Sequence, residues 1–423
     1  MFDLFFQIKD LVLSKTAKET GIMFFGNISS FLFGILFTVI AARLIAPEGW
    51  GIAAGVMGFV VILSSFADLG LTSGLFRFVS GLVAQGKRLE AYKMQSFIFT
   101  LRIISSLVFV LFLLLFPSLI SRTFFRLENP AVAYIAALGL FGLLLIDFQI
   151  TTFQSKGRWR PAAVFSALTN FFRLVILLTL SSLNLLNLIT FLLTFFASPL
   201  LSFILTLFWE RPRLFFPKNF RKAFSQVSKF SSWLGLNRIV GATTSRVDAL
   251  LLLQLATPSE AGIVGVARQL ANAVLILLSS FATVIAPRFS SYTGKHLKKY
   301  YGKTILFSIM LSVGVLLGTL LVEPVTNLLG PKYRASAGVL TWLLIGLIPF
   351  SLSAPFVNAL IYSYKKPQAI ALLSTVQLPL VIFGNFYFIP RYGIFGPVIV
   401  IGLWNLSTLL VTSLFSSYYF SKK

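Results

Sequence analysis

The side chains most able to do chemistry are charged residues that interrupt long apolar stretches. They are three aspartates and five arginines: Asp68, Asp147, Asp248, Arg102, Arg173, Arg238, Arg246 and Arg268. A charge at the centre of a membrane helix costs about 2.5–3.5 kcal/mol on insertion scales, so it needs a partner or a water-filled cavity. Arg43 and Arg77 lie near the ends of their stretches, where the side chain can reach the membrane surface and needs no further role.

Arg102 and Asp147 are predicted to form a structural ion pair. Arg102 lies about eight residues into its apolar stretch, and Asp147 lies about seven residues from the inner end of the following one, at about 1.5 Å of rise per residue. The two side chains therefore have matching depths, and pairing relieves both charges. Ligand binding is the alternative role for this pair.

Arg173, Arg238 and Arg246 are the candidates for a cationic cavity. Arg238 and Arg246 are eight residues apart and share one broad face of a helix. A guanidinium group matches phosphate oxygens through two parallel hydrogen bonds, so such a cavity would favour a phosphate-bearing ligand. The alternative is salt bridging between two lobes, with Asp68 and Asp248 as the partners. Either aspartate could also bind a coupling proton or sodium ion, and both interpretations stay open.

Several kinds of chemistry are excluded by residue counts. The chain has no cysteine and a single histidine, His296. Disulfides, thiolate or histidine-rich metal sites, cysteine nucleophiles and Ser-His-Asp triads are therefore impossible. The ATP-binding pattern G-x-x-x-x-G-K-[ST] is also absent. The sequence thus predicts no catalytic residue, no metal and no cofactor, and favours a protein that is not an enzyme.

The charged residues are carried by membrane helices. Of 423 residues, 57% are hydrophobic and 11% are charged, which is under half the charge of a soluble domain. At about 20 residues per span this composition allows about 12 helices. We predict spans at about 20–44, 51–79, 94–116, 131–154, 162–183, 188–209, 230–256, 262–286, 303–322, 337–362, 368–389 and 394–420. The predicted fold class is therefore an all-α integral membrane protein.

The positive charges predict the orientation of the chain. If the N-terminus is cytoplasmic, the inner segments hold 24 Lys and Arg residues and the outer segments hold five. Both termini are then cytoplasmic, and residues 1–19 form an amphipathic segment on the membrane surface rather than a cleaved signal. The net charge of +24 follows from this topology and from attraction to anionic lipids, so nucleic-acid binding is not predicted.

An internal repeat divides the chain. The pattern Pro47-x-x-x-Gly51-Ile52 recurs as Pro258-x-x-x-Gly262-Ile263, and Arg77-Phe78-x-Ser80 recurs as Arg288-Phe289-x-Ser291, both at an offset of 211 residues. We expect an N-lobe at 20–209 and a C-lobe at 230–420, each with six spans, joined by a cytoplasmic linker at 210–229. Six is an even number, so the repeats are parallel, which suggests two bundles on either side of a central cleft.

At these residues the sequence resembles the oligosaccharide flippases, or Wzx-type polysaccharide exporters, of the superfamily that also holds the multidrug and toxic compound extruders and the lipid II flippase. The resemblance covers nearly the whole chain. It rests on residues 42–51, Asp68-Leu69-Gly70-Leu71 with Arg77, Asp248 to Leu253, Glu260-Ala261-Gly262-Ile263 with Ala267, Leu329 to Ala335, and Asn385 to Gly396. One departure is Val264, where the family often has tyrosine.

The resemblance implies a two-lobed carrier that opens alternately to each face of the bacterial cytoplasmic (inner) membrane. Its expected cargo is a polyprenyl-pyrophosphate-linked oligosaccharide, such as an O-antigen unit, used for cell-surface polysaccharide biosynthesis. The pyrophosphate would be received by Arg173, Arg238 and Arg246. Membrane lipids, and other membrane proteins of polysaccharide assembly, are the further partners that it implies.

Two other functions compete with this one. A multidrug or toxic compound extruder would use the same architecture, but a cavity with more arginine than carboxylate repels organic cations. An integral-membrane polymerase or glycosyltransferase usually has a large outer domain, whereas the outer loops here are short, the longest being about 117–130 and 323–336. Neither loop holds a paired acid or a set of metal ligands.

Overall fold

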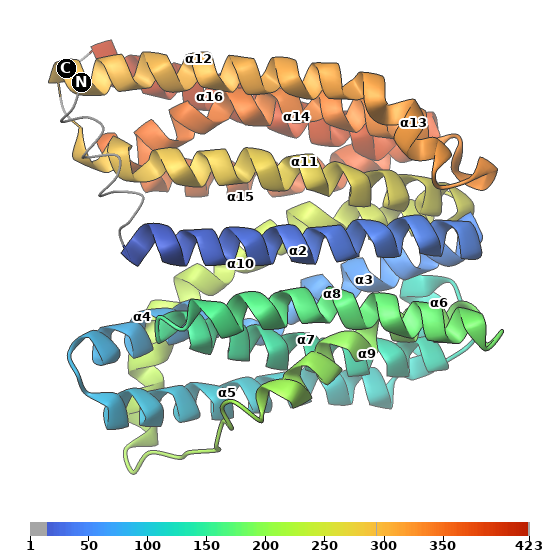
Figure 1. Cartoon of the computed structure of the whole chain (residues 1–423), viewed down its shortest axis with the longest axis horizontal. Coiled ribbons are helices and arrows are strands. Elements are labelled where there is room, and N and C mark those ends of the chain that lie inside the picture. The colour runs from blue at the N-terminus through green and yellow to red at the C-terminus, as the bar shows by residue number, and fades with distance from the viewer. Residues whose placement is uncertain (1–14, 293, 422–423) are drawn as a thin grey trace. The chain divides into compact units, whose positions relative to one another are not determined.

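The protein is all-helical where the computed structural model describes it, at residues 15–292 and 294–421. Its longer helices, coloured along the chain in Figure 1, are α2 (Lys15–Leu44), α3 (Pro47–Asp68), α4 (Leu71–Ala84), α5 (Arg88–Leu115), α6 (Pro117–Phe125), α7 (Ala131–Ser155), α8 (Trp159–Ser182), α9 (Leu188–Thr206), α10 (Phe220–Leu255), α11 (Pro258–Ser291), α12 (Gly294–Gly318), α14 (Ser336–Asn358), α15 (Pro367–Tyr392) and α16 (Gly396–Ser421). Short elements are η1 (Thr319–Leu321), α13 (Val322–Asn327), η2 (Pro331–Tyr333), η3 (Ala359–Ser363) and η4 (Gly393–Phe395).

Twelve helices of the described chain are long enough to cross a bilayer. Ten stretches qualify by length and apolar composition, and one of these, Pro367–Tyr419, contains both α15 and α16. α10 has 36 residues but is made more polar by charges that include Arg238, Arg246 and Asp248. The prediction of an all-α, multi-pass membrane protein with about twelve spans is confirmed.

One predicted span is wrong. The stretch at 51–79 is two helices, because α3 ends at Asp68 and α4 begins at Leu71. Between them Leu69 (φ 47°) and Gly70 (φ 78°) adopt left-handed backbone conformations, which end the hydrogen-bonded pattern of α3. Asp68 and Gly70 mark this point in the sequence, but apolar residues continue on both sides of them, so the stretch was predicted as one span.

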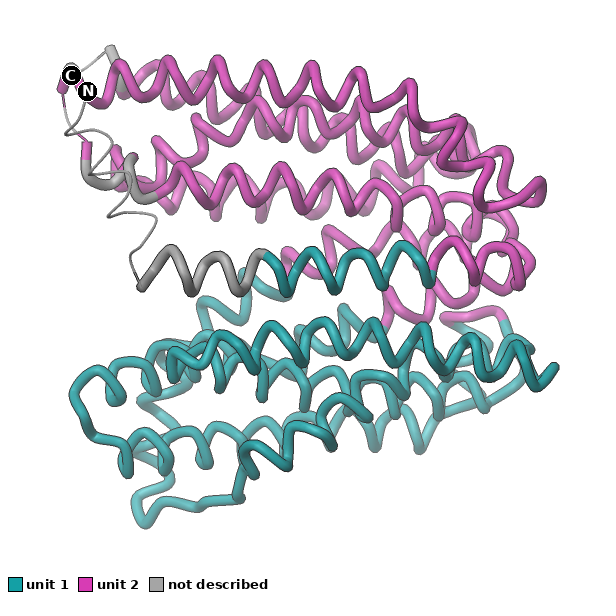
Figure 2. The backbone as a smooth tube through the Cα atoms, in the orientation of Figure 1, with its two compact units in different colours: residues 1–37, 60–123, 127–239 teal, residues 38–59, 124–126, 240–423 magenta. Residues whose placement is uncertain are grey.

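The described residues form two compact units that differ from the predicted lobes in their boundaries (Figure 2). Unit 1 holds the chain up to Phe37, Val60–Thr123 and Leu127–Ile239, and unit 2 holds Thr38–Phe59, Phe124–Arg126 and the chain from Val240. The boundaries fall inside α2, α3, α6 and α10, so each of these helices contributes to both units. The division into lobes at 20–209 and 230–420 stays a prediction.

Small residues let the helices of unit 1 approach closely. α9 has a buried row of hydroxyl side chains at every fourth position: Thr194, Ser198, Ser202 and Thr206. On α7, a Cβ atom at Gly139 would lie 2.0 Å from the ring of Phe196 of α9, so only glycine fits there. This is the packing expected of membrane helices, where close backbone approach replaces the hydrophobic driving force.

The two copies of the repeat motif meet inside unit 2. A Cβ at Gly51 would lie 1.9 Å from the carbonyl oxygen of Pro258, and a Cβ at Gly262 would lie 1.8 Å from that of Pro47. The beginnings of α3 and α11 therefore cross with reciprocal contacts, in which each glycine accommodates the backbone of the other copy. The structure thus gives these prolines and glycines a packing role.

The segment after α9 is held against unit 1. Glu210 forms ion pairs with Lys156 and with Arg158 (3.1 Å), and it accepts a hydrogen bond from Gln95 (3.0 Å). Further along, the backbone N–H of Phe215 donates to the hydroxyl of Thr100 on α5 (2.8 Å). The second part of the predicted linker is helical, because α10 begins at Phe220.

Candidate functional site

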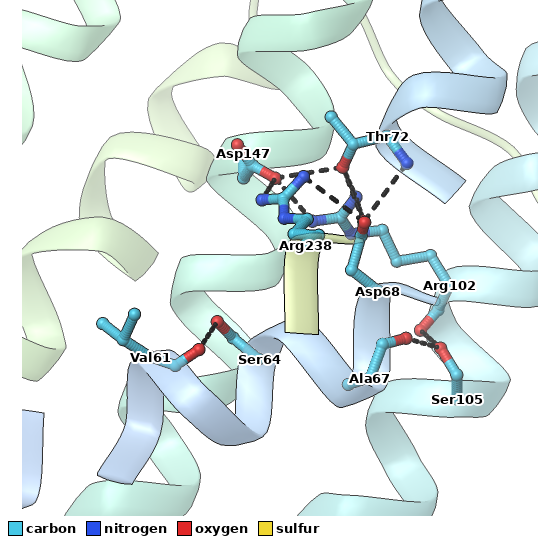
Figure 3. Close-up of polar contacts among 9 residues, drawn as sticks. All are labelled: Val61, Ser64, Ala67, Asp68, Thr72, Arg102, Ser105, Asp147 and Arg238. Carbon is cyan, nitrogen blue, oxygen red and sulfur yellow. Dashed lines mark hydrogen bonds and ion pairs between the residues drawn. The ribbon is translucent and has the colours of Figure 1, made fainter. Parts of the chain in front are cut away.

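Four charged side chains from four helices converge inside unit 1 (Figure 3). Asp68 ends α3, Arg102 lies on α5, Asp147 on α7 and Arg238 on α10. Together with Thr72 of α4 they form what we call the charge network. Its two positive and two negative charges balance, so its net formal charge is zero.

Arg102 is at the centre of the charge network. Its Nη1 lies 2.7 Å from Asp68 Oδ1, and its Nη2 lies 2.8 Å from Asp147 Oδ2. The side chains of Arg102 and Asp68 are 1% and 0% exposed. A guanidinium group removed from water to this extent is retained only with its charge compensated, and here two carboxylates compensate it.

Arg238 closes the charge network from its more accessible side. Its Nη2 lies 3.1 Å from Asp147 Oδ2, and its Nη1 lies 3.3 Å from Asp68 Oδ2. The side chains of Arg238 and Asp147 are 38% and 34% exposed. The network therefore has a sealed half, made of Asp68 and Arg102, and an open half, made of Asp147 and Arg238.

The break after α3 positions Asp68. Asp68 Oδ1 accepts hydrogen bonds from the hydroxyl of Thr72 (2.5 Å) and from its backbone N–H (3.2 Å), so the carboxylate also caps the first turn of α4. The hydroxyl oxygen of Thr72 in turn accepts from Arg102 Nη1 (2.7 Å). One carboxylate thus serves both the helix terminus and the network.

Glycines bring α10 to this break. A Cβ at Gly70 would lie 2.2 Å from the carbonyl oxygen of Ser231, and a Cβ at Gly235 would lie 2.6 Å from the backbone of Leu69. The break therefore requires glycine on both sides of the contact. Arg238 is three residues beyond Gly235 on the same face of α10, and the close approach carries its side chain to Asp68.

Unit 2 holds a separate ion pair. Asp248 on α10 pairs with Arg268 on α11, and Arg268 Nη2 also donates to the carbonyl oxygen of Ser245 at 2.5 Å. Asp248 is 3% exposed, while the Arg268 side chain is 19% exposed. With this pair, each of the three aspartates in the predicted spans has an arginine partner.

Of the five arginines that interrupt the apolar stretches, Arg173 and Arg246 form no ion pair among the described residues. Arg173 on α8 packs against the rings of Phe37 and Phe195, at 5.7 and 4.8 Å from its Cζ to the ring centroids. Its buried Nε makes no hydrogen bond within that part of the chain. Arg246 on α10 is partly buried and forms no ion pair there, although it lies within electrostatic range of Asp248 and Arg268. Cation–π contacts stabilise a guanidinium group by about 0.5–2 kcal/mol but leave its charge uncompensated.

The residues predicted from sequence occur in three settings within the described chain. These are the charge network of unit 1, the ion pair of unit 2, and the two arginines that form no ion pair. Arg102 and Asp147 lie within 2.8 Å of each other, and the pair is part of a larger cluster. Arg238 contacts Asp68 inside unit 1, whereas sequence analysis grouped it with Arg173 and Arg246. The pairing of Asp248 with Arg268 was missed, and the only signal for it was that Arg268 is a second charge at membrane depth on the next helix.

The family follows from comparison with known proteins. Residues 16–293 match the family model described as polysaccharide biosynthesis protein. The chain belongs to this family. No curated protein sequence matches the chain significantly.

Solved structures show the same fold at low sequence identity. The lipid II flippase MurJ in an inward closed conformation superimposes with a TM-score of 0.75 at 16% identity, covering 94% of this chain and 87% of that one. A multidrug resistance MATE transporter of the MOP superfamily, in an inward-facing conformation, gives 0.70 at 14% identity, covering 93% and 95%. A mutant of the Vibrio cholerae MATE transporter VcmN gives 0.57 at 13% identity, covering 96% and 98%. These folds are those of membrane flippases and transporters rather than of enzymes.

Proposed function

We propose that this membrane protein is a flippase for a polyprenyl-pyrophosphate-linked oligosaccharide, which it moves across the bacterial cytoplasmic membrane by alternating access for polysaccharide biosynthesis. The family match and the MurJ-like fold support a carrier of lipid-linked saccharides. The residues at 20–209 and 230–420 would form the two lobes that open alternately, with both termini in the cytoplasm. Membrane lipids and other assembly proteins would be its partners.

The charge left after pairing is the observation that carries this proposal. All three aspartates in the spans form ion pairs with Arg102, Arg238 or Arg268. Arg173 and Arg246 form no ion pair among the described residues, and Arg246 lies within electrostatic range of both charges of the Asp248–Arg268 pair. An uncompensated cation at membrane depth is costly unless an anionic group binds beside it. A pyrophosphate supplies such a group, and its oxygens match the guanidinium geometry. We therefore keep Arg173, Arg238 and Arg246 as the residues proposed to bind the pyrophosphate.

The charge network would play a different part. Asp68 and Asp147 are engaged by Arg102 and Arg238, so we assign them to pairing within unit 1. A phosphate that approached Arg238 would compete with Asp147 for the same guanidinium group. Partner exchange at Arg238 would then couple cargo binding to the packing of α10.

A transport assay in liposomes tests the function. The protein would be reconstituted with a polyprenyl pyrophosphate that carries a fluorescent saccharide, and the fraction that becomes accessible to an external quencher would be followed over time. We expect facilitated transfer of this lipid and no uptake of an organic-cation dye. The R173M/R246M variant should lose at least tenfold in rate, whereas R122M, which removes an exposed arginine of α6, should keep the rate.

The extruder alternative predicts the opposite pattern. Dye uptake that survives R173M/R246M, with no transfer of the pyrophosphate lipid, would contradict the flippase and leave these arginines with a packing role. The excess of arginine over aspartate in the spans argues against that outcome, because an organic cation would be repelled.

A further inference from the structure

A second feature of unit 1 is a polar pocket next to the charge network. Its volume is about 450 Å³, and it lies between α4, α7 and α10. The residues around it are Thr72, Ser73, Phe76, Arg77, Thr151, Gln154 and Phe230. Thr72 belongs to both features, so the pocket begins where the network ends. Small-molecule sites in proteins usually measure about 300–1,000 Å³.

Three hydrogen-bonding side chains around the pocket have no partner within the described chain. Thr151 is 6% exposed, yet its hydroxyl makes no hydrogen bond to any described residue. Ser73 and Gln154 are partly buried and likewise unpaired there. None of these polar atoms is among the fully buried unpaired ones, so each remains accessible and is available to hydrogen-bond a ligand in the pocket.

The hydroxyl of the next residue, Thr152, has different surroundings from that of Thr151. Thr152 also has an unpaired hydroxyl, but this atom is fully buried, and Thr152 is absent from the residues that surround the pocket. Adjacent positions on a helix point about 100° apart, so only one of the two hydroxyls can serve a ligand in this pocket. Thr151 is therefore the informative position, and Thr152 is its natural control.

The remaining walls suit a ring with apolar faces. Phe76 is 44% exposed, and Phe230 is partly buried. The guanidinium group of Arg77 lies 4.0 Å from the centroid of the Phe230 ring, which fixes both side chains at one edge of the pocket. Hydroxyl and amide groups beside exposed aromatic faces complement a pyranose, which has polar edges and apolar C–H faces.

We infer that this pocket is a saccharide subsite that holds a sugar of the lipid-linked cargo, with Thr151 and Gln154 as hydrogen-bonding groups. This inference rests on the proposed function and specifies where the sugar binds. The neutral donors and acceptors of the pocket recognise hydroxyl groups, while the unpaired arginines elsewhere in the chain recognise the pyrophosphate. Arg77 is the one fully charged residue among the described residues around the pocket, so a phosphate there could pair with a single guanidinium group.

The test compares ligands with and without sugar on the purified full-length protein. Binding would be measured for a polyprenyl pyrophosphate that carries one N-acetylhexosamine and for the same lipid without sugar. Thermal protection by free N-acetylglucosamine and galactose at millimolar concentration would be measured in parallel. We expect wild type to bind the sugar-bearing lipid more tightly. T151V and Q154L should each lower that affinity about three- to tenfold, should leave the sugar-free lipid unaffected, and should weaken the protection by free sugar.

The matched control is T152V, which removes the same hydroxyl one position away and should change none of these values. Equal effects of T151V and T152V would overturn the subsite, and so would equal wild-type affinities for the two lipids. Failure of both lipids to bind would contradict the proposed flippase instead. In that case protection by free sugar decides the pocket: sensitivity to T151V but not T152V supports it, and no such sensitivity rejects it.

Discussion

Arg102 and Arg173 are the same residue type on apolar helices of one unit, yet their surroundings differ in kind. Arg102 is almost fully buried and lies between two aspartates at 2.7 and 2.8 Å. Arg173 packs on two phenylalanine rings, with no described carboxylate in reach. The first environment satisfies the charge from within the chain. The environment of Arg173 leaves its positive charge available to an anion. We therefore distinguish arginines that stabilise the fold, such as Arg102, from arginines that can bind an anion, such as Arg173.

The largest expected loss of stability comes from a substitution in the sealed half of the charge network. Replacing Asp68 with Asn should lower the free energy of unfolding by about 3–5 kcal/mol, because Arg102 and Arg238 would share one carboxylate in a buried site. Thermal unfolding in detergent would measure it. E128Q removes an exposed carboxylate and should cost at most about 1 kcal/mol. Equal stabilities of the two variants would show that the network does not hold the fold.

The pair in unit 2 should be less sensitive. D248N leaves Arg268 with its hydrogen bond to the carbonyl oxygen of Ser245 and with a side chain that is 19% exposed. We expect a loss of about 1.5–3 kcal/mol, the usual range for a hydrogen bond to a charged group. The same unfolding assay measures it. A loss larger than that of D68N would reverse the ranking of the two clusters.

The smallest effect is expected at the segment after α9. E210Q removes the ion pairs with Lys156 and Arg158 but keeps a polar group of the same shape. Global stability should fall by about 0.5–1.5 kcal/mol, the range for one ordinary hydrogen bond, because the glutamine amide can still bond to its neighbours. Trypsin should cut faster after Arg213, which would be held less firmly. E90Q, at an exposed position on α5, is the control. Identical cleavage of both variants would mean that Glu210 does not hold this segment.

The membrane helices, and the charged residues that interrupt them, could be predicted from sequence, because both follow from the order of apolar and charged residues along the chain. Sequence analysis predicted Arg102 beside Asp147, since matching depth on consecutive spans places them at one level. It missed the break at Leu69 and Gly70, because apolar residues continue on both sides and the left-handed turn is held by a close contact with α10. A salt bridge of Arg238 with Asp68 was one of the two interpretations left open, because the close contact at Gly235 that brings these residues together joins helices far apart in sequence.

The most direct measurement compares polyprenyl pyrophosphate with polyprenyl alcohol as stabilisers of the purified protein. Binding to the folded state should raise its stability by about 2.7 kcal/mol at 100 times Kd. We predict that only the pyrophosphate lipid protects wild type. The R173M/R246M variant should unfold near the wild-type temperature in the absence of lipid but lose this protection. Protection that persists in R173M/R246M, or equal protection by the alcohol, would contradict the assignment of the unpaired arginines to anion binding.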